Sequence, residues 1–181
     1  MNENINIQAV PSFCLNHIQL DVLRLDELHP IVSGNKWFKL KYYLQQAQEQ
    51  NADTIASFGG PYSNHLVALA YATKEKTLKS IGYVRSNIDE PITPTLQEAM
   101  HYGMDLKFLG RNNFQEFKKE LIENNQANHT YFIDEGGYGI LGAQGAATIL
   151  SNEKTNSYNH IICAVGTGTM MAGLIDAAKP H

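Results

Sequence analysis

The chain has 181 residues, 43% of them hydrophobic, which is enough to bury a core in one domain or in two small ones. Its 18 acidic residues outnumber its 14 basic ones, and no basic run points to nucleic acid or to an anionic membrane as a partner. No apolar stretch approaches the length of a membrane span, and the polar start does not resemble a signal peptide. We therefore expect a cytoplasmic protein in which Cys14 and Cys163 are reduced thiols.

Short apolar runs alternate with amphipathic stretches along the chain. The apolar runs predict strands over His17–Arg24, Thr54–Phe58, Leu78–Val84, Met104–Leu109, Thr130–Ile133 and His160–Val165. The amphipathic stretches predict helices over Lys36–Gln50, Ser63–Lys74, Thr93–Tyr102, Asn113–Asn124, Gly142–Ser151 and Met170–Ala178. This alternation favours an α/β fold with a mostly parallel sheet and right-handed crossovers.

The first predicted helix begins within the segment SGNKWFKL at residues 33–40. Gly34 frees the backbone there, and Ser33 or Asn35 can serve as the N-cap. Lys36 falls in the first turn, where the helix dipole and the unpaired N–H groups disfavour a positive charge. A lowered pKa favours the neutral amine, which is the form that attacks an aldehyde. Taken alone, the segment also fits a solvated lysine on an ordinary helix.

The next strand and helix are joined by the glycine-rich turn GGPYSNH at residues 59–65. In an open α/β sheet, ligands collect outside the carboxyl ends of the strands, where helix N-termini point their donors. Ser63 is a good N-cap, and Asn64 adds an amide that can both donate and accept. The alternative is a capping turn that binds no ligand.

Two further glycine-rich turns follow predicted strands later in the chain. The turn DEGGYG at 134–139 is either a flexible connection or a loop that closes over a ligand. The turn GTGT at 166–169 combines two glycines, two hydroxyls and a helix start, a set that suits a phosphate. Its alternatives are an unliganded tight turn and the start of a dinucleotide-binding unit.

Together these segments resemble the pyridoxal-phosphate-dependent family typified by 1-aminocyclopropane-1-carboxylate deaminase and D-cysteine desulfhydrase. SGNKWFKL is similar to the family's GGNKxRKL segment, and GGPYSNH is similar to its GGxxSN(H/Q) turn. EGG at 135–137 with LGA at 141–143 resembles a third family segment, and residues 166–173 resemble the loop that binds the cofactor phosphate. The four segments occur in the family's order.

The resemblance implies a tryptophan-synthase-β-like α/β fold (fold type II), with two open, twisted, mostly parallel sheets and flanking helices. It implies a larger cofactor domain from residues 1–49 and 129–181 and a smaller domain from residues 50–128, with pyridoxal 5′-phosphate held between them. Family members continue well beyond the length of this chain. We therefore expect the C-terminal part of the larger domain to be absent, and a homodimer to cover the exposed sheet edge.

The resemblance also implies roles for individual residues. Lys36 would bond covalently to the cofactor and then move a proton of the substrate. Asn64 would hydrogen-bond the pyridoxal 3′-oxygen. The substrate would be held by Ser63, Asn64 and His65, with Ser63 near the reacting carbon. The phosphate would lie on Gly166, Thr167, Gly168 and Thr169, and no metal is expected.

Three positions depart from the family pattern, with Ser33 in place of glycine, Phe38 in place of arginine and Met170 where a threonine often binds phosphate.

The expected activity is elimination or deamination of a small amino acid, releasing ammonia and a 2-oxo acid. The residues present do not separate a deaminase from a desulfhydrase. The alternatives are a shortened paralogue that holds the cofactor or a partner chain without turnover, and a nucleotide-binding Rossmann domain.

Overall fold

The computed structural model describes residues 5–13, 17–87, 89–124, 129–151 and 153–178, so the thiol expected at Cys14 lies outside the described residues. The strands are β1 (Ile7–Ala9), β2 (Asp21–Leu23), β3 (Thr54–Gly59), β4 (Lys79–Arg85), β5 (Met104–Leu109) and β6 (Thr130–Ile133). The α-helices are α1 (Asn35–Glu49), α2 (Asn64–Glu75), α3 (Pro94–His101), α4 (Phe114–Asn124), α5 (Ile140–Ala147) and α6 (Thr169–Ala177). Short 3₁₀ turns cover Pro11–Phe13 (η1), Leu25–Glu27 (η2), Glu135–Gly137 (η3), Thr148–Leu150 (η4) and Glu153–Ser157 (η5). In this part of the chain, no helix is both long and apolar enough to cross a membrane.

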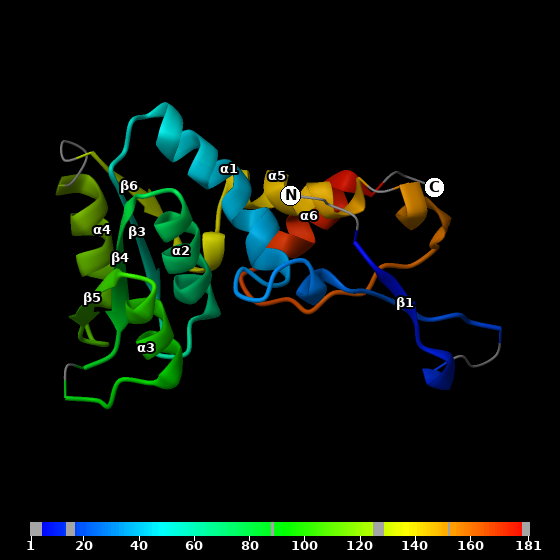
Figure 1. Cartoon of the computed structure of the whole chain (residues 1–181), viewed down its shortest axis with the longest axis horizontal. Coiled ribbons are helices and arrows are strands. Elements are labelled where there is room, and N and C mark those ends of the chain that lie inside the picture. The colour runs from blue at the N-terminus through cyan, green and yellow to red at the C-terminus, as the bar shows by residue number, and fades with distance from the viewer. Residues whose placement is uncertain (1–4, 14–16, 88, 125–128, 152, 179–181) are drawn as a thin grey trace.

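Four strands form a parallel sheet in the order β5-β4-β3-β6. Every residue of β3 is buried, as expected for a central strand covered on both faces. Successive residues of β3 point to opposite faces, and Ser57 contacts His65 of α2 while Phe58 lies 6.2 Å, between ring centroids, from Phe114 of α4. Helices α2 and α4 therefore cover opposite faces of the sheet (Figure 1). The predicted α/β class with a parallel sheet is confirmed.

Helix α1 connects this sheet to a second group of helices. Its residues Leu40 and Leu44 lie in the core of the sheet and α2, whereas Phe38 lies in a second core formed with α5 and α6. Figure 1 shows the sheet at one end of the molecule, α1, α5 and α6 in the middle, and β1 at the other end. The start of α1 therefore lies where the two groups of elements meet.

Two predicted strands differ from the structure. The run predicted as a strand over His17–Arg24 is reduced to β2, which pairs antiparallel with β1 in a separate two-stranded sheet. The run His160–Val165 forms no strand, and Ile162 within it is 87% exposed. A strand needs a neighbour to satisfy its backbone groups, and no described strand pairs with residues 160–165. The second parallel sheet of the expected pair is therefore not formed within the described residues.

The expected division into two domains remains a proposal, but strand pairing bears on where its boundary falls. Strand β6 pairs in parallel with β3, from Thr54 with Thr130 to Ser57 with Ile133. Residues 130–133 thus lie in the sheet of the smaller unit, although the sequence assigned them to the larger one. We propose that the division falls after β6 and before α5.

Candidate active site

Lys36 lies in the first turn of α1, as expected. Gly34 occupies the N-cap position with φ of 64°, so neither Ser33 nor Asn35 is the cap residue that the sequence suggested. The Lys36 Nζ donates a hydrogen bond to Asn35 Oδ1 at 2.8 Å. Burial lowers the pKa of Lys36, which is the predicted direction, through desolvation of the charged form.

Lys39 is a site residue that the sequence analysis missed. The residue is only 3% exposed, and its Nζ donates to the Thr167 hydroxyl at 3.3 Å. Burial, with a smaller contribution from the nearby charge of Lys36, lowers the pKa of Lys39 to about 8. The sequence spacing could have indicated Lys39, because Lys36 and Lys39 are three residues apart and therefore lie on the same face of the helix.

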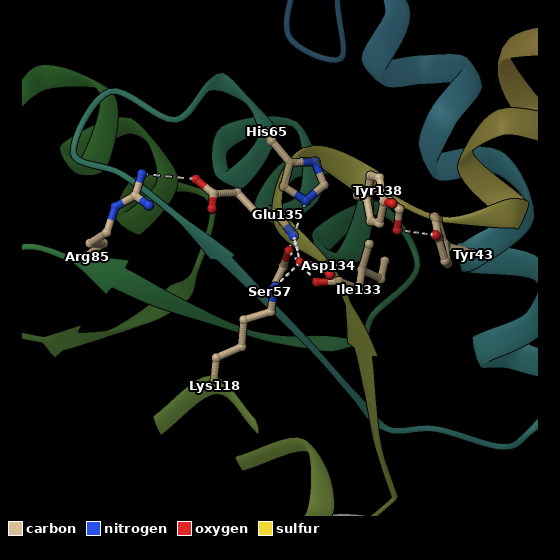
Figure 2. Close-up of polar contacts among 9 residues, drawn as sticks. All are labelled: Tyr43, Ser57, His65, Arg85, Lys118, Ile133, Asp134, Glu135 and Tyr138. Atoms are coloured by element: carbon tan, nitrogen blue, oxygen red, sulfur yellow. Dashed lines mark hydrogen bonds and ion pairs between the residues drawn. The ribbon is translucent and has the colours of Figure 1, made fainter. Parts of the chain in front are cut away.

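The start of α2 carries three predicted site residues with different surroundings. The Ser63 hydroxyl caps the helix by accepting from the Leu66 N–H at 3.4 Å, and Asn64 is exposed. His65 is 2% exposed, and its Nε2 lies 2.9 Å from the Ser57 hydroxyl (Figure 2). Burial, followed by the charges of Lys36 and Lys39, lowers the pKa of His65 to about 3. The ring is therefore neutral.

The turn at residues 166–169 contacts α1 through Lys39. Gly168 is the N-cap residue of α6 with φ of 78°, and the Thr167 and Thr169 hydroxyls are 3.0 Å apart. Nothing lies within 4 Å of the points that a Cβ would occupy on Gly166 or Gly168, so the backbone of this turn is accessible. The first N–H groups of α6 have no acceptor within their own helix. Hydroxyls, free N–H groups and the Lys39 ammonium together make a donor set suited to an anion.

A sulfur contact links the two helix starts. The Asn35 side-chain amide donates to the Met170 sulfur at 3.3 Å, which joins the first turn of α1 to the first turn of α6. Met170, one of the departures from the family pattern, therefore serves here as an acceptor for a neighbouring side chain.

The turn at 134–139 lies against the same cluster and is not a free connection. Gly136 and Gly137 have φ of 67° and 70°. A Cβ on Gly136 would lie 3.1 Å from the Thr167 methyl carbon, and one on Gly137 would lie 3.5 Å from Lys39 Cε. The turn is held on its far side by the Tyr43 hydroxyl, which donates to the Tyr138 carbonyl at 2.7 Å (Figure 2).

The structure thus brings together most of the residues singled out from the sequence. Lys36, Lys39 and His65 interact electrostatically, and Thr167 and Thr169 join them through Lys39. Ser63 and Asn64 lie at the same end of α2 as His65, but the Ser63 hydroxyl is turned toward its own helix. In the described part of the chain, no group of His, Cys, Asp or Glu is arranged to hold a metal ion. The cluster offers an amine of lowered pKa beside an anion cradle, which fits an aldehyde that carries a phosphate.

Comparison with known proteins agrees with this chemistry. Residues 15–181 match the family model described as "Pyridoxal-phosphate dependent enzyme". A Thermotoga maritima protein provisionally named a 1-aminocyclopropane-1-carboxylate deaminase is 30% identical over 84% of this chain and 52% of its own length. The Arabidopsis thaliana bifunctional D-cysteine desulfhydrase/1-aminocyclopropane-1-carboxylate deaminase is 26% identical over 93% of this chain and 46% of its own length.

Solved structures agree at the level of the fold. A crystal structure of a 1-aminocyclopropane-1-carboxylate deaminase homologue superposes with a TM-score of 0.79 and 23% identity, covering 96% of this chain and 55% of that chain. A pyridoxal 5′-phosphate-dependent aspartate racemase follows with a TM-score of 0.74 and 18% identity, covering 96% of this chain and 53% of that chain. The chain spans about half the length of the relatives that it matches.

Proposed function

Because the chain belongs to the family of pyridoxal-phosphate-dependent enzymes, we propose that it acts on a small amino acid and releases ammonia and a 2-oxo acid. The proposed type is that of 1-aminocyclopropane-1-carboxylate deaminase or D-cysteine desulfhydrase, which the relatives at 26–30% identity support. The observation that carries the proposal is the hydrogen bond from Lys39, three residues after Lys36 on α1, to Thr167 in the turn at 166–169. The dinucleotide-binding alternative loses its support, because this family uses pyridoxal phosphate.

Lys36 is the proposed residue that bonds to the cofactor. A neutral amine is needed to attack an aldehyde carbon, and burial shifts Lys36 toward this form. The same amine, once released, can move a proton at the α-carbon of the substrate. The bound cofactor would supply the electron sink that makes this proton removable.

The phosphate-binding residues are proposed to be Gly166, Thr167, Gly168 and Thr169, with Lys39 as an added cation. Lys39 already donates to the Thr167 hydroxyl, so its charge lies beside the hydroxyls and backbone N–H groups of the turn. Hydrogen bonds to charged partners are about twice as strong as neutral ones. Lys39 would also add a full positive charge beside the anion, which neither threonine hydroxyl carries.

The substrate is proposed to lie at the start of α2. Asn64 is exposed there and can hydrogen-bond the cofactor ring or the substrate, and Ser63 lies next to it. The backbone N–H groups of Asn64 and His65 belong to the first turn of the helix, where they are free to hold a carboxylate. The cofactor would then lie between the two proposed domains, with α1 and α6 on one side and α2 on the other.

The test is titration of pyridoxal phosphate into the 181-residue chain, followed by visible absorbance. Borohydride reduction and peptide mass spectrometry should locate the cofactor on Lys36. Lys36→Ala should abolish the absorbance of covalently bound cofactor, whereas Lys41→Ala on the same helix should retain it. An unchanged spectrum in Lys36→Ala would refute the assignment of Lys36.

Turnover is tested separately by measuring ammonia release from D-cysteine and from 1-aminocyclopropane-1-carboxylate. Release from either substrate identifies the activity. Cofactor bonded to Lys36 without release from any small amino acid would instead favour the non-catalytic paralogue.

A further inference from the structure

The turn that connects β6 to α5 carries two acidic residues, and both form ion pairs with the sheet or the helix that covers it. Asp134 pairs with Lys118 of α4. Glu135 pairs with Arg85, the last residue of β4, with 3.4 Å between Oε1 and Nη2. Figure 2 shows Lys118 and Arg85 reaching the turn from different directions. The turn is therefore tied by charge to the elements that precede it, although it leads into α5.

Lys118 differs from an ordinary surface lysine. Its side chain is 16% exposed, whereas that of the next residue, Lys119, is 77% exposed. The Lys118 Nζ also lies 5.3 Å from the centroid of the Phe58 ring of β3, so an aromatic face contacts the cation. Exposed ion pairs contribute little, because water and side-chain freedom compete with them. These costs are smaller for a side chain that is already packed, so the pair with Asp134 can fix the position of the turn.

Asp134 also organises the backbone of the turn. Its carboxylate accepts from the Glu135 N–H, and its carbonyl accepts from the Gly137 N–H at 2.9 Å. Gly136 and Gly137 have φ of 67° and 70°, a conformation that residues with a Cβ rarely adopt. The backbone is therefore held by hydrogen bonds from the ion pair to the two glycines.

The two glycines place bare backbone against the anion cradle, by which we mean Lys39 together with the turn at 166–169. The point that a Cβ on Gly136 would occupy lies 3.1 Å from Thr167 Cγ2 and 4.0 Å from Lys39 Nζ. A Cβ on Gly137 would lie 3.4 Å from Lys39 Cβ. Lys39 and Thr167 are the two residues that join α1 to the cradle by a hydrogen bond. A displaced glycine turn would therefore free both of them to move.

We propose that Lys118 and Arg85 are positioning residues for the anion cradle, and that they act by holding the turn at 134–137 against Lys39. Their effect passes through the backbone of the turn. Lys118 should have the larger effect of the two, because its side chain is the less exposed. The inference rests on the proposed phosphate role of residues 166–169, but not on the proposed activity.

Binding of inorganic phosphate tests the proposal, and two adjacent lysines of α4 supply a matched pair of variants. Lys118→Met should weaken phosphate binding about fivefold at pH 7, whereas Lys119→Met should leave it unchanged. Lys118→Arg keeps the charge and should restore most of the affinity. Calorimetric titration measures all three. An unchanged affinity in folded Lys118→Met, or an equal loss in Lys119→Met, would overturn the proposal.

A double-mutant cycle shows whether Lys118 acts through Asp134. Asp134→Asn keeps an acceptor for the Glu135 N–H but removes the charge from the ion pair. If the pair positions the turn, Asp134→Asn should also weaken phosphate binding, and the double variant should bind about as weakly as either single one. A direct attraction between Lys118 and the anion predicts the opposite sign, because loss of the Asp134 charge would then strengthen binding. Strengthened binding in Asp134→Asn would overturn the proposal.

Hydrogen exchange in the unliganded chain separates positioning from general stability. The Gly137 N–H donates to the Asp134 carbonyl, so its exchange reports opening of the turn. Exchange at Gly137 should be faster in Lys118→Met and, to a smaller degree, in Arg85→Met, while the amides of β3 exchange as in the unmodified chain. Arg85→Met keeps the test available if Lys118→Met does not fold. Unchanged exchange at Gly137 in the folded variants would overturn the proposal.

The amide signals of Thr167 and Gly168 distinguish failure of this proposal from failure of the proposed phosphate role. Both signals should shift in the ¹H–¹⁵N spectrum of unliganded Lys118→Met and stay in place in Lys119→Met. An unmodified chain that binds no phosphate would refute the phosphate role of the turn, and the same spectra would then decide whether Lys118 positions it. Signals that coincide in the unmodified chain and in Lys118→Met would overturn the positioning role, whatever the phosphate affinity.

Discussion

At the scale of single residues, the three bases of the site are all shifted toward their neutral forms. Burial is the first cause for Lys36, Lys39 and His65, and the charges of the lysines add to it for Lys39 and His65. The site therefore loses positive charge at a lower pH than exposed lysines would. A bound anion reverses this balance, because a nearby negative charge favours protonated lysine.

The pKa of His65 predicts how stability depends on pH. The imidazole has a pKa of 6.5 when unfolded and about 3 when folded, so between these values the unfolded chain binds a proton that the folded chain does not. The contribution to stability is complete above pH 6.5 and falls with pH below it, by up to about 1.4 kcal/mol per unit. Urea denaturation between pH 4.5 and pH 6.5, within this window, should show a shallower slope in His65→Gln than in the unmodified chain. The exposed His101→Gln should keep the original slope, and equal slopes in all three proteins would contradict the expectation.

The pKa of Lys39 predicts how anion affinity depends on pH. Lys39 is charged below about pH 8 and loses its charge as the pH rises through this value. Inorganic phosphate should therefore bind more weakly at pH 9 than at pH 7. Lys39→Met should weaken phosphate binding roughly tenfold at pH 7 and flatten the pH dependence, because it removes one charged hydrogen bond. Calorimetric titration measures both effects, with Lys41→Met as the control, and a Lys39→Met chain that binds phosphate with unchanged affinity would refute the role.

The sequence predicted the positions of site residues correctly where capping residues and glycines fix the start of a helix. The glycine before Lys36 and the serine before Asn64 mark helix starts, and both helices begin within one residue of the prediction. Lys39 was missed because its spacing from Lys36 indicates a shared helix face but does not tell whether that face is buried or solvated. The Ser57 contact of His65 depends on a strand and a helix meeting in space, which no local pattern records.

At the scale of elements, the site is held together by helices that pack at glycines. A Cβ on Gly145 of α5 would lie 2.0 Å from the Phe38 carbonyl oxygen of α1, and one on Gly173 of α6 would lie 2.2 Å from the Ala143 carbonyl oxygen. The missing side chains let the three helices approach closely. This packing keeps the first turns of α1 and α6 near each other, where Asn35 donates to the Met170 sulfur.

Gly145→Ala should test this packing directly. The added methyl meets backbone rather than a flexible side chain, so α1 and α5 must move apart, at a cost of about 1–3 kcal/mol in the free energy of unfolding. The displacement should also weaken phosphate binding, because it moves Lys39 relative to the 166–169 turn. Gln144→Ala, at the exposed neighbour on the same helix, should change neither quantity. A Gly145→Ala chain with unaltered stability would show that α5 can shift without loss.

Element prediction succeeded where a segment finds its partners within the described chain. The runs predicted as β3 to β6 all lie in one sheet, and each boundary is within one residue. Residues 160–165 have the composition of a buried strand, yet their side chains are largely exposed because no described strand lies beside them. A segment with strand-forming composition becomes a strand only where a neighbouring strand can pair with it.

At the scale of the whole molecule, the apolar residues of 160–165 and α6 form a continuous surface. They line a cavity of about 650 Å³ that also includes residues of η5. Ile162, Val165 and Ile175 are among the exposed large apolar side chains that border it. Large exposed apolar surfaces mark places where proteins associate.

We therefore predict that the 181-residue chain self-associates through this surface, with a second copy as the occupant of the cavity. The double substitution Ile162→Ser and Ile175→Ser should raise the dissociation constant at least about tenfold, because burial of each isoleucine contributes about 1.5–3 kcal/mol. Sedimentation velocity over a range of concentrations measures the change. The matched control replaces Ile18 and Ile92, which are exposed away from the cavity, and should sediment like the unmodified chain. An unmodified chain that stays monomeric at every concentration, or a double variant that associates as tightly, would show that this surface does not join copies of the chain.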